Sequence, residues 1–225
     1  MRVLLFGATG MVGRGVLREC LQAADVEQVL AVGRTSTSQQ HPKLREMIRP
    51  SLMDVGEVEA ELRDFDACFF CLGVSSAGLT EARYTEVTYD WTLTVANILA
   101  RLNPQMTFVY VSGAGTDSTE SGRSMWARVK GKTENALMRL PFKGVYLFRP
   151  GVIQPLHGIQ SKTGSYRWFY TLTAPLLPIL RALFPAQILT TQTIGRAMLA
   201  VARHGAQRPV LESRDIYAIG SAAVQ

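Results

Sequence analysis

The sequence predicts an α/β fold in which helices cover both faces of a parallel sheet. Short, continuous apolar runs such as "VLLF" (3–6) end in glycine, and longer segments with helical spacing follow them. Strands buried on both faces read as unbroken apolar runs, and parallel neighbours are joined by crossovers, most often helices. The alternation of the two therefore predicts a doubly wound parallel sheet.

The strands can be placed in chain order. The first two, "VLLF" and "VLAV", each stop at a glycine, and the third is weak because only Met47 and Ile48 follow the polar loop "RTSTSQQHPK". Three further apolar runs, "DACFFCLG", "MTFVYVS" and "GVYLFRPG", complete the set. The predicted strands are 3–6, 29–32, 47–48, 66–73, 106–112 and 144–151.

Helices are predicted where apolar residues recur at helical spacing. The first spans 11–23, and the second, 86–102, carries an apolar residue at every fourth position until Asn103-Pro104 stops it. A third helix is predicted over 126–140, and "TIGRAMLAVARHG" forms a further helix that ends at its glycine.

The chain of 225 residues is long enough for one domain with a buried core. Residues 1–150 carry the regular alternation and form the predicted nucleotide-binding core. Beyond Gly151 the pattern weakens, and 151–225 is too short for an independent domain. We therefore expect this C-terminal segment to cover the substrate side, at the open end of the sheet.

Composition favours a globular protein that binds no nucleic acid and does not insert stably into a membrane. Hydrophobic residues make up 47% of the chain and charged residues 19%, and the net charge of +6 is scattered. A nucleic-acid surface usually shows a basic cluster with interleaved aromatic residues, and none is obvious. The most membrane-like stretch, Trp168–Phe184, is short and carries two prolines and Arg181, which favours a lid, a pocket wall or an interface.

The start of the chain indicates a cytoplasmic protein, and the spacing of its cysteines indicates a buried strand. The chain begins directly with "MRVLLFG", without a basic and then apolar leader, so we expect a cytoplasmic location. Cys68 and Cys71 form a CxxC pattern, but residues three apart on a strand point to opposite faces. We therefore expect buried strand cysteines and no metal site.

The strongest functional signal is the turn "GATGMVG" between the first strand and the first helix. Gly7 allows a sharp turn, Gly10 lets a pyrophosphate approach the backbone, and Gly13 lets the helix pack near the strand. Amides of the first helical turn then point at phosphate, where the helix dipole favours negative charge. A tight turn that binds nothing is the alternative. The residues expected to line the phosphate site with these glycines are Thr9, Met11 and Val12.

The end of the second strand favours a phosphorylated nucleotide. An NAD-selective site usually carries Asp or Glu there, to accept a hydrogen bond from the ribose 2′-hydroxyl. Here the strand ends in "VGRTS", where Arg34 can pair with a 2′-phosphate and the hydroxyls of Thr35 and Ser36 can add hydrogen bonds. We therefore predict NADP(H) over NAD(H), with a solvated surface arginine as the alternative.

Other strand ends are expected to complete this site, because ligands bind beyond the carboxyl ends of parallel strands. Asp54, in "LMDV", is placed to meet the adenine amino group, or else is an ordinary loop carboxylate. Cys71, Leu72 and Gly73 end the fourth predicted strand and should run alongside the adenosine ribose and the diphosphate.

Together these features resemble the short-chain dehydrogenase/reductase superfamily, whose members have the Rossmann fold. The branch that they match is the atypical one of NmrA-like and Tat-interacting-protein-like NAD(P)-binding proteins. The shared segments are "GATGMVGRGVL", "CLG", "VSGAG", "VKGKTE" and "FRPG", which cover most of the chain from residue 1 to about 155.

The resemblance implies functional roles for particular residues. In catalytic members a serine ends the fifth strand, and a tyrosine that passes a proton precedes a lysine by four positions. Ser112 matches the serine, Lys130 matches the lysine that holds the nicotinamide ribose, and Pro150 of "FRPG" is expected at the cofactor. Trp126 occupies the tyrosine position, and an indole N–H cannot relay a proton near neutral pH. The alternative for Lys130 is a solvated helix lysine paired with Glu134.

The segment after residue 151 contains candidates for the missing proton donor. Tyr166, in "GIQSKTGSYRWFY", is the predicted substitute, with a packed aromatic residue as the alternative. Tyr170 lies in the same stretch, and His157 follows "RPGVIQPL" and could approach the site.

Three functions fit the sequence. The first is an NADP(H)-dependent oxidoreductase or epimerase-like enzyme that acts on a small organic substrate. The second is a non-catalytic NADP(H)-sensing regulator that binds a protein partner. The third is a structural factor that has lost the ligand, and the intact glycine turn argues against it. A homodimer is compatible with each of them.

Overall fold

The computed structural model describes residues 1–156 and 184–223, with the backbone alone for residues 52–55. The strands of its main sheet are β1 (Arg2–Phe6), β2 (Gln28–Gly33), β3 (Leu44–Ile48), β4 (Ala67–Phe70), β5 (Thr107–Val111), β6 (Gly144–Arg149) and β9 (Val210–Glu212). They form one sheet of seven strands in the order β3-β2-β1-β4-β5-β6-β9, and every neighbouring pair is parallel. The doubly wound fold predicted from the sequence is thereby confirmed, because the first six strands have the order typical of dinucleotide-binding folds.

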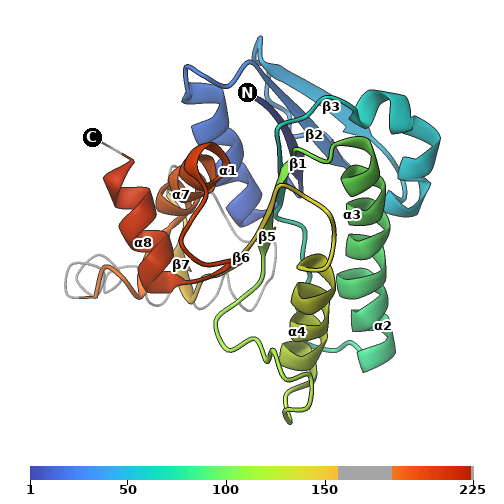
Figure 1. Cartoon of the computed structure of the whole chain (residues 1–225), viewed down its shortest axis with the longest axis vertical. Helices are drawn as coiled ribbons and strands as arrows, with labels where there is room; N and C mark the ends of the chain where they lie inside the picture. Colours follow the sequence, from blue (N-terminus) through green and yellow to red (C-terminus); the bar gives the residue numbers. More distant parts are fainter. Residues whose placement is uncertain (157–183, 224–225) are drawn as a thin grey trace.

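Helices cover both faces of this sheet. They are α1 (Met11–Gln22), α2 (Glu81–Thr85), α3 (Trp91–Leu102), α4 (Met125–Leu137), α7 (Thr191–His204) and α8 (Ser213–Ala222), with the 3₁₀ segment η1 (Leu52–Leu62) and the π-helical turn η2 (Glu86–Asp90). Figure 1 shows α1, α7 and α8 on one face, and α3 and α4 on the other. The sheet is therefore the middle layer of three.

Each face of the sheet has its own hydrophobic core, which explains the unbroken apolar run of β1. Val3 and Leu5 are fully buried in the layer under α1 and α7, whereas Leu4 and Phe6 are fully buried in the layer under α3. Because successive side chains alternate between the faces, both sets must be apolar.

The two cysteines of "CFFC" point to opposite faces, as the sequence predicts. Cys68 is buried in the α3 layer, and Cys71 packs against the α1 layer. Burial raises the pKa of both thiols, so they stay protonated at neutral pH. Within residues 1–156 and 184–223, no three His, Cys, Asp or Glu side chains gather as metal ligands would.

The predicted helix 86–102 is interrupted by the π-helical turn η2 and preceded by α2. Thr80 caps the start of α2, because its side chain accepts a hydrogen bond from the Arg83 N–H at 3.3 Å. The apolar residues from Val87 to Leu99 recur every fourth position, a spacing wider than the 3.6 residues of an α-helical turn. Leu99 of this series is buried in the α3 layer of the core, whereas Trp91 is half-buried and its ring lies beside the Arg83 guanidinium.

The residues after 184 belong to the same domain as the first half of the chain. Helix α7 packs on α1, where the buried carboxylate of Glu19 accepts from Arg196 Nε at 3.1 Å. Two short strands, β7 (Val152–Gln154) and β8 (Ile188–Thr190), form a separate parallel pair. In the part of the chain that is described, no helix is both long and apolar enough for a membrane span.

Candidate functional site

The carboxyl ends of the strands surround a cavity of about 1010 Å³. The turn after β1, the loop after β2 and the ends of β4, β5 and β6 all contribute to its wall. This is the edge at which doubly wound sheets bind ligands. The predicted cofactor-binding residues that line it are Gly7, Thr9, Gly10, Met11, Val12, Arg34, Thr35, Cys71, Leu72, Gly73, Ser112, Lys130 and Pro150.

The glycine turn brings strand β1 and helix α1 into close contact. Gly7 has a φ of +81°, which strongly favours glycine. A Cβ atom added to Gly13 would lie 2.1 Å from the Gly7 carbonyl oxygen. Gly13 therefore serves the packing of the helix on the turn, and it is not among the residues that line the cavity.

The first turn of α1 is open to an anion. Its N-cap residue is Gly10, so no N-cap side chain caps the backbone amides of this turn. No acidic residue occupies the first turn either. Met11 and Val12 line the cavity, so the backbone amides of this turn lie at its wall. Because the helix dipole is positive at this end, the turn fits a diphosphate group.

The loop after β2 brings a positive side chain to the cavity, and the neighbouring strand β3 brings a negative one. Arg34 and Thr35 line it as expected, and so does Glu46 of β3. The Glu46 carboxylate accepts hydrogen bonds from the Thr37 N–H at 2.6 Å and from the Ser36 hydroxyl at 2.7 Å. The end of β2 itself carries no carboxylate. Glu46 reaches the cavity because β3 pairs with β2, and no sequence motif identifies it.

Ser112, which follows β5, lies in the wall with its hydroxyl engaged. Its Oγ lies 2.9 Å from Thr116 Oγ1, which itself donates to the Gly113 carbonyl at 2.7 Å. Because a hydroxyl has one proton, Thr116 accepts from Ser112 in this arrangement. Ser112 then offers a ligand only acceptor lone pairs, unless it first releases Thr116.

Lys130 of α4 lines the cavity in an environment that disfavours its charge. Burial lowers the pKa of Lys130 to about 8, and the attraction of Glu134 opposes this only in part. The Nζ atom lies 5.2 Å from the centre of the Tyr110 ring, within cation–π range. Glu134 pairs with Arg149, and Lys130 forms no salt bridge within the described residues. The alternative of a Lys130–Glu134 ion pair is therefore wrong.

Trp126, one helical turn before Lys130, forms part of the same wall. Its indole lies over the loop after β5, since a Cβ atom added to Gly115 would come within 3.5 Å of the ring. The side chain is half-buried. An indole at this place can stack on a ligand but brings no group that ionises near neutral pH.

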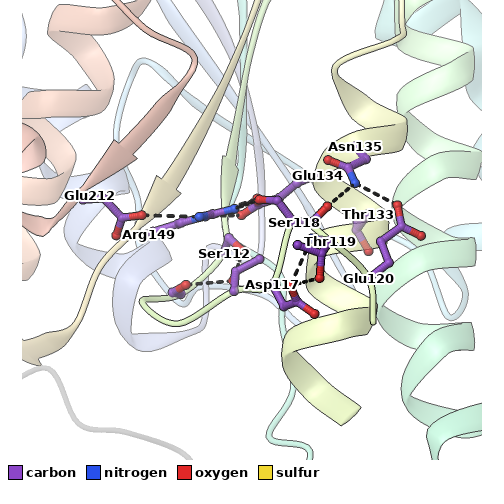
Figure 2. Close-up of polar contacts among 12 residues, drawn as sticks. Ser112, Asp117, Ser118, Thr119, Glu120, Thr133, Glu134, Asn135, Arg149 and Glu212 are labelled. Carbon is purple, nitrogen blue, oxygen red and sulfur yellow. Dashed lines mark hydrogen bonds and ion pairs between the residues drawn. The ribbon is translucent and has the colours of Figure 1, made fainter. Parts of the chain in front are cut away.

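A buried ion pair fixes α4 against the sheet (Figure 2). Arg149, the last residue of β6, donates from Nε to both oxygens of the Glu134 carboxylate, at 3.0 and 3.2 Å, and also from Nη2. Glu134 is fully buried. The guanidinium also donates to Ser118 Oγ at 2.6 Å and to Glu212 at 3.4 Å. The segments "VKGKTE" and "FRPG" thus meet here and hold the helix that carries Lys130.

One cavity residue, Tyr84 of α2, was not predicted from the sequence. It is 2% exposed and is among the residues that line the cavity. No motif marks it, and the helix was expected to begin only at residue 86. Tyr166 and His157 lie outside the described residues, as does the side chain of Asp54.

Residues 7–138 match the model of a protein family described as NAD(P)H-binding. That span covers more than half of the chain and includes the glycine turn, Arg34, Ser112 and Lys130. The chain belongs to the NAD(P)H-binding family. A nicotinamide nucleotide is therefore the ligand class of this NAD(P)H-binding protein.

Curated relatives confirm the atypical branch of the short-chain dehydrogenase/reductase superfamily. "Protein FMP52, mitochondrial" of Meyerozyma guilliermondii is 26% identical over 155 residues, which are 68% of this chain and 65% of that protein. "Protein HTATIP2" of Rattus norvegicus is 26% identical over 154 residues, which are 67% of this chain and 62% of that protein. The match thus spans less than two thirds of either relative.

Solved structures show the same fold at low identity. The Bordetella bronchiseptica enzyme WbmF in complex with NAD+ has a TM-score of 0.68 at 17% identity, over 99% of this chain and 78% of that one. A UDP-glucose 4-epimerase of Thermotoga maritima, solved with UDP-glucose, has a TM-score of 0.70 at 13% identity, over 99% and 82% of the two chains. At these identities the likeness shows the fold alone.

Proposed function

We propose that the chain is an NADP(H)-binding oxidoreductase-type protein that acts on a small organic substrate without the usual catalytic tyrosine. The observation that supports this is a single cavity that combines the glycine turn, Arg34, Ser112 and Lys130. The turn fits a diphosphate, Arg34 fits a 2′-phosphate, and Ser112 and Lys130 occupy the positions of catalytic residues in the superfamily. Trp126 in place of the tyrosine sets the chain apart from ordinary carbonyl reductases.

Different residues of the cavity would bind different parts of the nucleotide. The amides of Met11 and Val12 would hold the diphosphate, and Arg34 with Thr35 would hold the 2′-phosphate. Lys130 would hold the nicotinamide ribose through its ammonium group. When bound, the nicotinamide supplies or accepts a hydride. The remaining residues proposed to lie along the nucleotide are Gly7, Thr9, Gly10, Asp54, Cys71, Leu72, Gly73, Ser112 and Pro150, whereas Gly13 is proposed to act only by letting α1 pack closely on the turn.

The protein must supply the proton that accompanies hydride transfer. Trp126 can donate a hydrogen bond but cannot release a proton near neutral pH. In the described wall Lys130, with a pKa of about 8, can do so. Tyr166 remains a proposed donor from the sequence. Ser112 would orient the substrate oxygen after its hydroxyl leaves Thr116.

The nucleotide preference tests this proposal directly. Calorimetric titration of the wild type should show NADPH binding about tenfold more tightly than NADH, because a charge-assisted contact to the 2′-phosphate contributes roughly 1.5–3 kcal/mol. Arg34→Glu should abolish or reverse that preference, because it replaces an attraction by a repulsion. NADH affinity should change little.

Arg139→Glu is the matched control, because Arg139 is exposed and lies outside the cavity wall. It makes the same charge change and should leave both affinities unaltered. Equal binding of the two nucleotides before and after Arg34→Glu would remove the argument for NADP(H). Absence of binding by either nucleotide would remove the proposed function itself.

A second candidate is a non-catalytic NADP(H)-sensing regulator that binds a protein partner. The observation that favours it is that Trp126 lies in the cavity wall. A catalytic member of the superfamily would have at this position a tyrosine that relays a proton. A homodimer is proposed for either candidate. We also propose a cytoplasmic location with no nucleic-acid partner and no stable membrane insertion. The label mitochondrial belongs to the names of the fungal relatives.

A further inference from the structure

The β2–β3 side of the cavity carries two opposite charges. Arg34 directly follows β2 and Glu46 lies on β3. Both residues are exposed and line the cavity. With Lys130 of α4 they are the charged side chains of the wall within the described residues. Because Lys130 comes from the helix that follows β5, Arg34 and Glu46 set the local charge at the β2–β3 end.

The Glu46 carboxylate is held in a fixed position. Its Oε1 accepts from the Thr37 N–H at 2.6 Å and its Oε2 accepts from the Ser36 hydroxyl at 2.7 Å. Burial alone would raise the pKa of Glu46, but these hydrogen bonds outweigh it and hold the pKa below its usual range. Glu46 is therefore an anion at neutral pH, attached to the loop that carries Arg34.

We propose that Glu46 is a specificity-determining residue that limits the preference for NADP(H). Its negative charge opposes the 2′-phosphate that Arg34 attracts, and its oxygens can accept a hydrogen bond from the 2′-hydroxyl of NAD(H). The inference rests on the proposed function, because it requires the adenosine end of the nucleotide to lie at the β2–β3 side of the cavity. The end of β2 carries no carboxylate, and the neighbouring strand β3 supplies one to this part of the cavity.

Two substitutions separate the charge of Glu46 from its support of the loop. Glu46→Gln removes the charge but keeps both hydrogen bonds, since an amide can accept from the Thr37 N–H and donate to the Ser36 oxygen. Glu46→Ala removes the charge and both hydrogen bonds. The probes are adenosine 2′,5′-bisphosphate and AMP, which differ only in the 2′-phosphate, together with NADPH and NADH.

Glu46→Gln should tighten the binding of the bisphosphate and of NADPH by about threefold to tenfold at low salt, because a like charge near a phosphate dianion is removed. AMP and NADH should bind equally well or more weakly. The gain should shrink as the ionic strength rises, because exposed charges are screened. Glu46→Ala should weaken all four probes relative to Glu46→Gln.

Glu61→Gln is the control, because Glu61 is an exposed carboxylate that lies outside this cavity wall, beside the first residues of β1 and β2. It changes the net charge equally and should leave every affinity unaltered. The inference is overturned if Glu46→Gln leaves the ratio of NADPH to NADH affinity unchanged or lowers it while Arg34→Glu still alters it. If none of the probes binds the wild type, the inference and the proposed function fail together.

Discussion

Burial of the Lys130 side chain lowers the pKa of its ammonium group and thereby affects the stability of the fold. Its pKa in the folded protein is about 8, against about 10.4 in an unfolded chain. Between those values the unfolded chain holds a proton that the folded protein lacks, so stability rises with pH. Below pH 8 the charged lysine destabilises the fold by about 1–3 kcal/mol. Lys130→Met should therefore be stabilising at pH 7, and its advantage should shrink from pH 8 to pH 10.

Urea denaturation at each pH measures that difference. Lys143→Met is the matched control, because Lys143 is exposed and lies outside the cavity wall, and its effect should vary much less with pH. A gain from Lys130→Met that is equal at pH 7 and pH 10 would contradict the burial of the ammonium group. Bound nucleotide should raise the pKa of Lys130, because it adds negative charge to the cavity.

Single residues differ in how readily the sequence reveals them. Gly7, Gly10 and Gly13 were recognisable because the geometry that needs them is local: a turn between adjacent elements. Glu46 and Tyr84 were not, because they reach the cavity through strand pairing and helix packing, which no local pattern encodes. Site residues that lie within a strand or a packed helix, away from the strand ends, are therefore the ones that local motifs do not reveal.

The connection between α4 and the sheet depends on the Arg149–Glu134 pair. Arg149→Met leaves the fully buried Glu134 carboxylate without its partner and should cost about 3–5 kcal/mol of unfolding free energy. The double variant Glu134→Met/Arg149→Met removes both charges and should recover most of that loss. Urea denaturation of the two single variants and the double variant measures the coupling.

The exposed pair of Arg208 with Asp215, at 2.6 Å, provides the comparison. Arg208→Met should cost less than about 1 kcal/mol, because solvent screens the pair. If Arg149→Met costs no more than this, the pair does not hold α4 in place.

Elements with strong periodicity were predictable, and short or irregular ones were not. Strands β1, β2 and β5 and helix α1 lie within one residue of their predicted bounds, whereas β4 ends three residues before the predicted strand 66–73. Strand β9 was missed because it has three residues and one buried side chain. Helix α8 begins with a capping box of Glu212 and Asp215, but these residue types differ from the usual Ser or Thr followed by Glu or Gln. The π turn η2 was missed because the stripe of every fourth residue was read as a regular helix.

Across the whole molecule, the two ends of the sheet should respond differently to nucleotide. The cavity lies at the carboxyl ends of the strands, so NADPH should slow hydrogen exchange in 7–13, 71–76 and 112–115. Segments at the amino ends, such as 60–66, should change little beyond any gain in global stability. Mass spectrometry of exchange with and without NADPH measures this. Equal protection at both ends would contradict the location of the site.

The overall architecture was the most predictable level. Parallel pairing follows from alternating strands and helices, and it places all the strand ends that carry "GATG", "CLG" and "VSGAG" along one edge. The role of the C-terminal segment in covering the substrate side stays a prediction, because much of it lies outside the described residues.

Trp126 gives the protein an intrinsic optical probe. Its indole lies in the cavity wall over Gly115, and its emission overlaps the absorption band of reduced nicotinamide. Bound NADPH should therefore quench this fluorophore by energy transfer, whereas the oxidised nucleotide, which lacks that band, should not do so in this way. Trp126 should thereby make cofactor binding and the redox state of the cofactor visible without any added label.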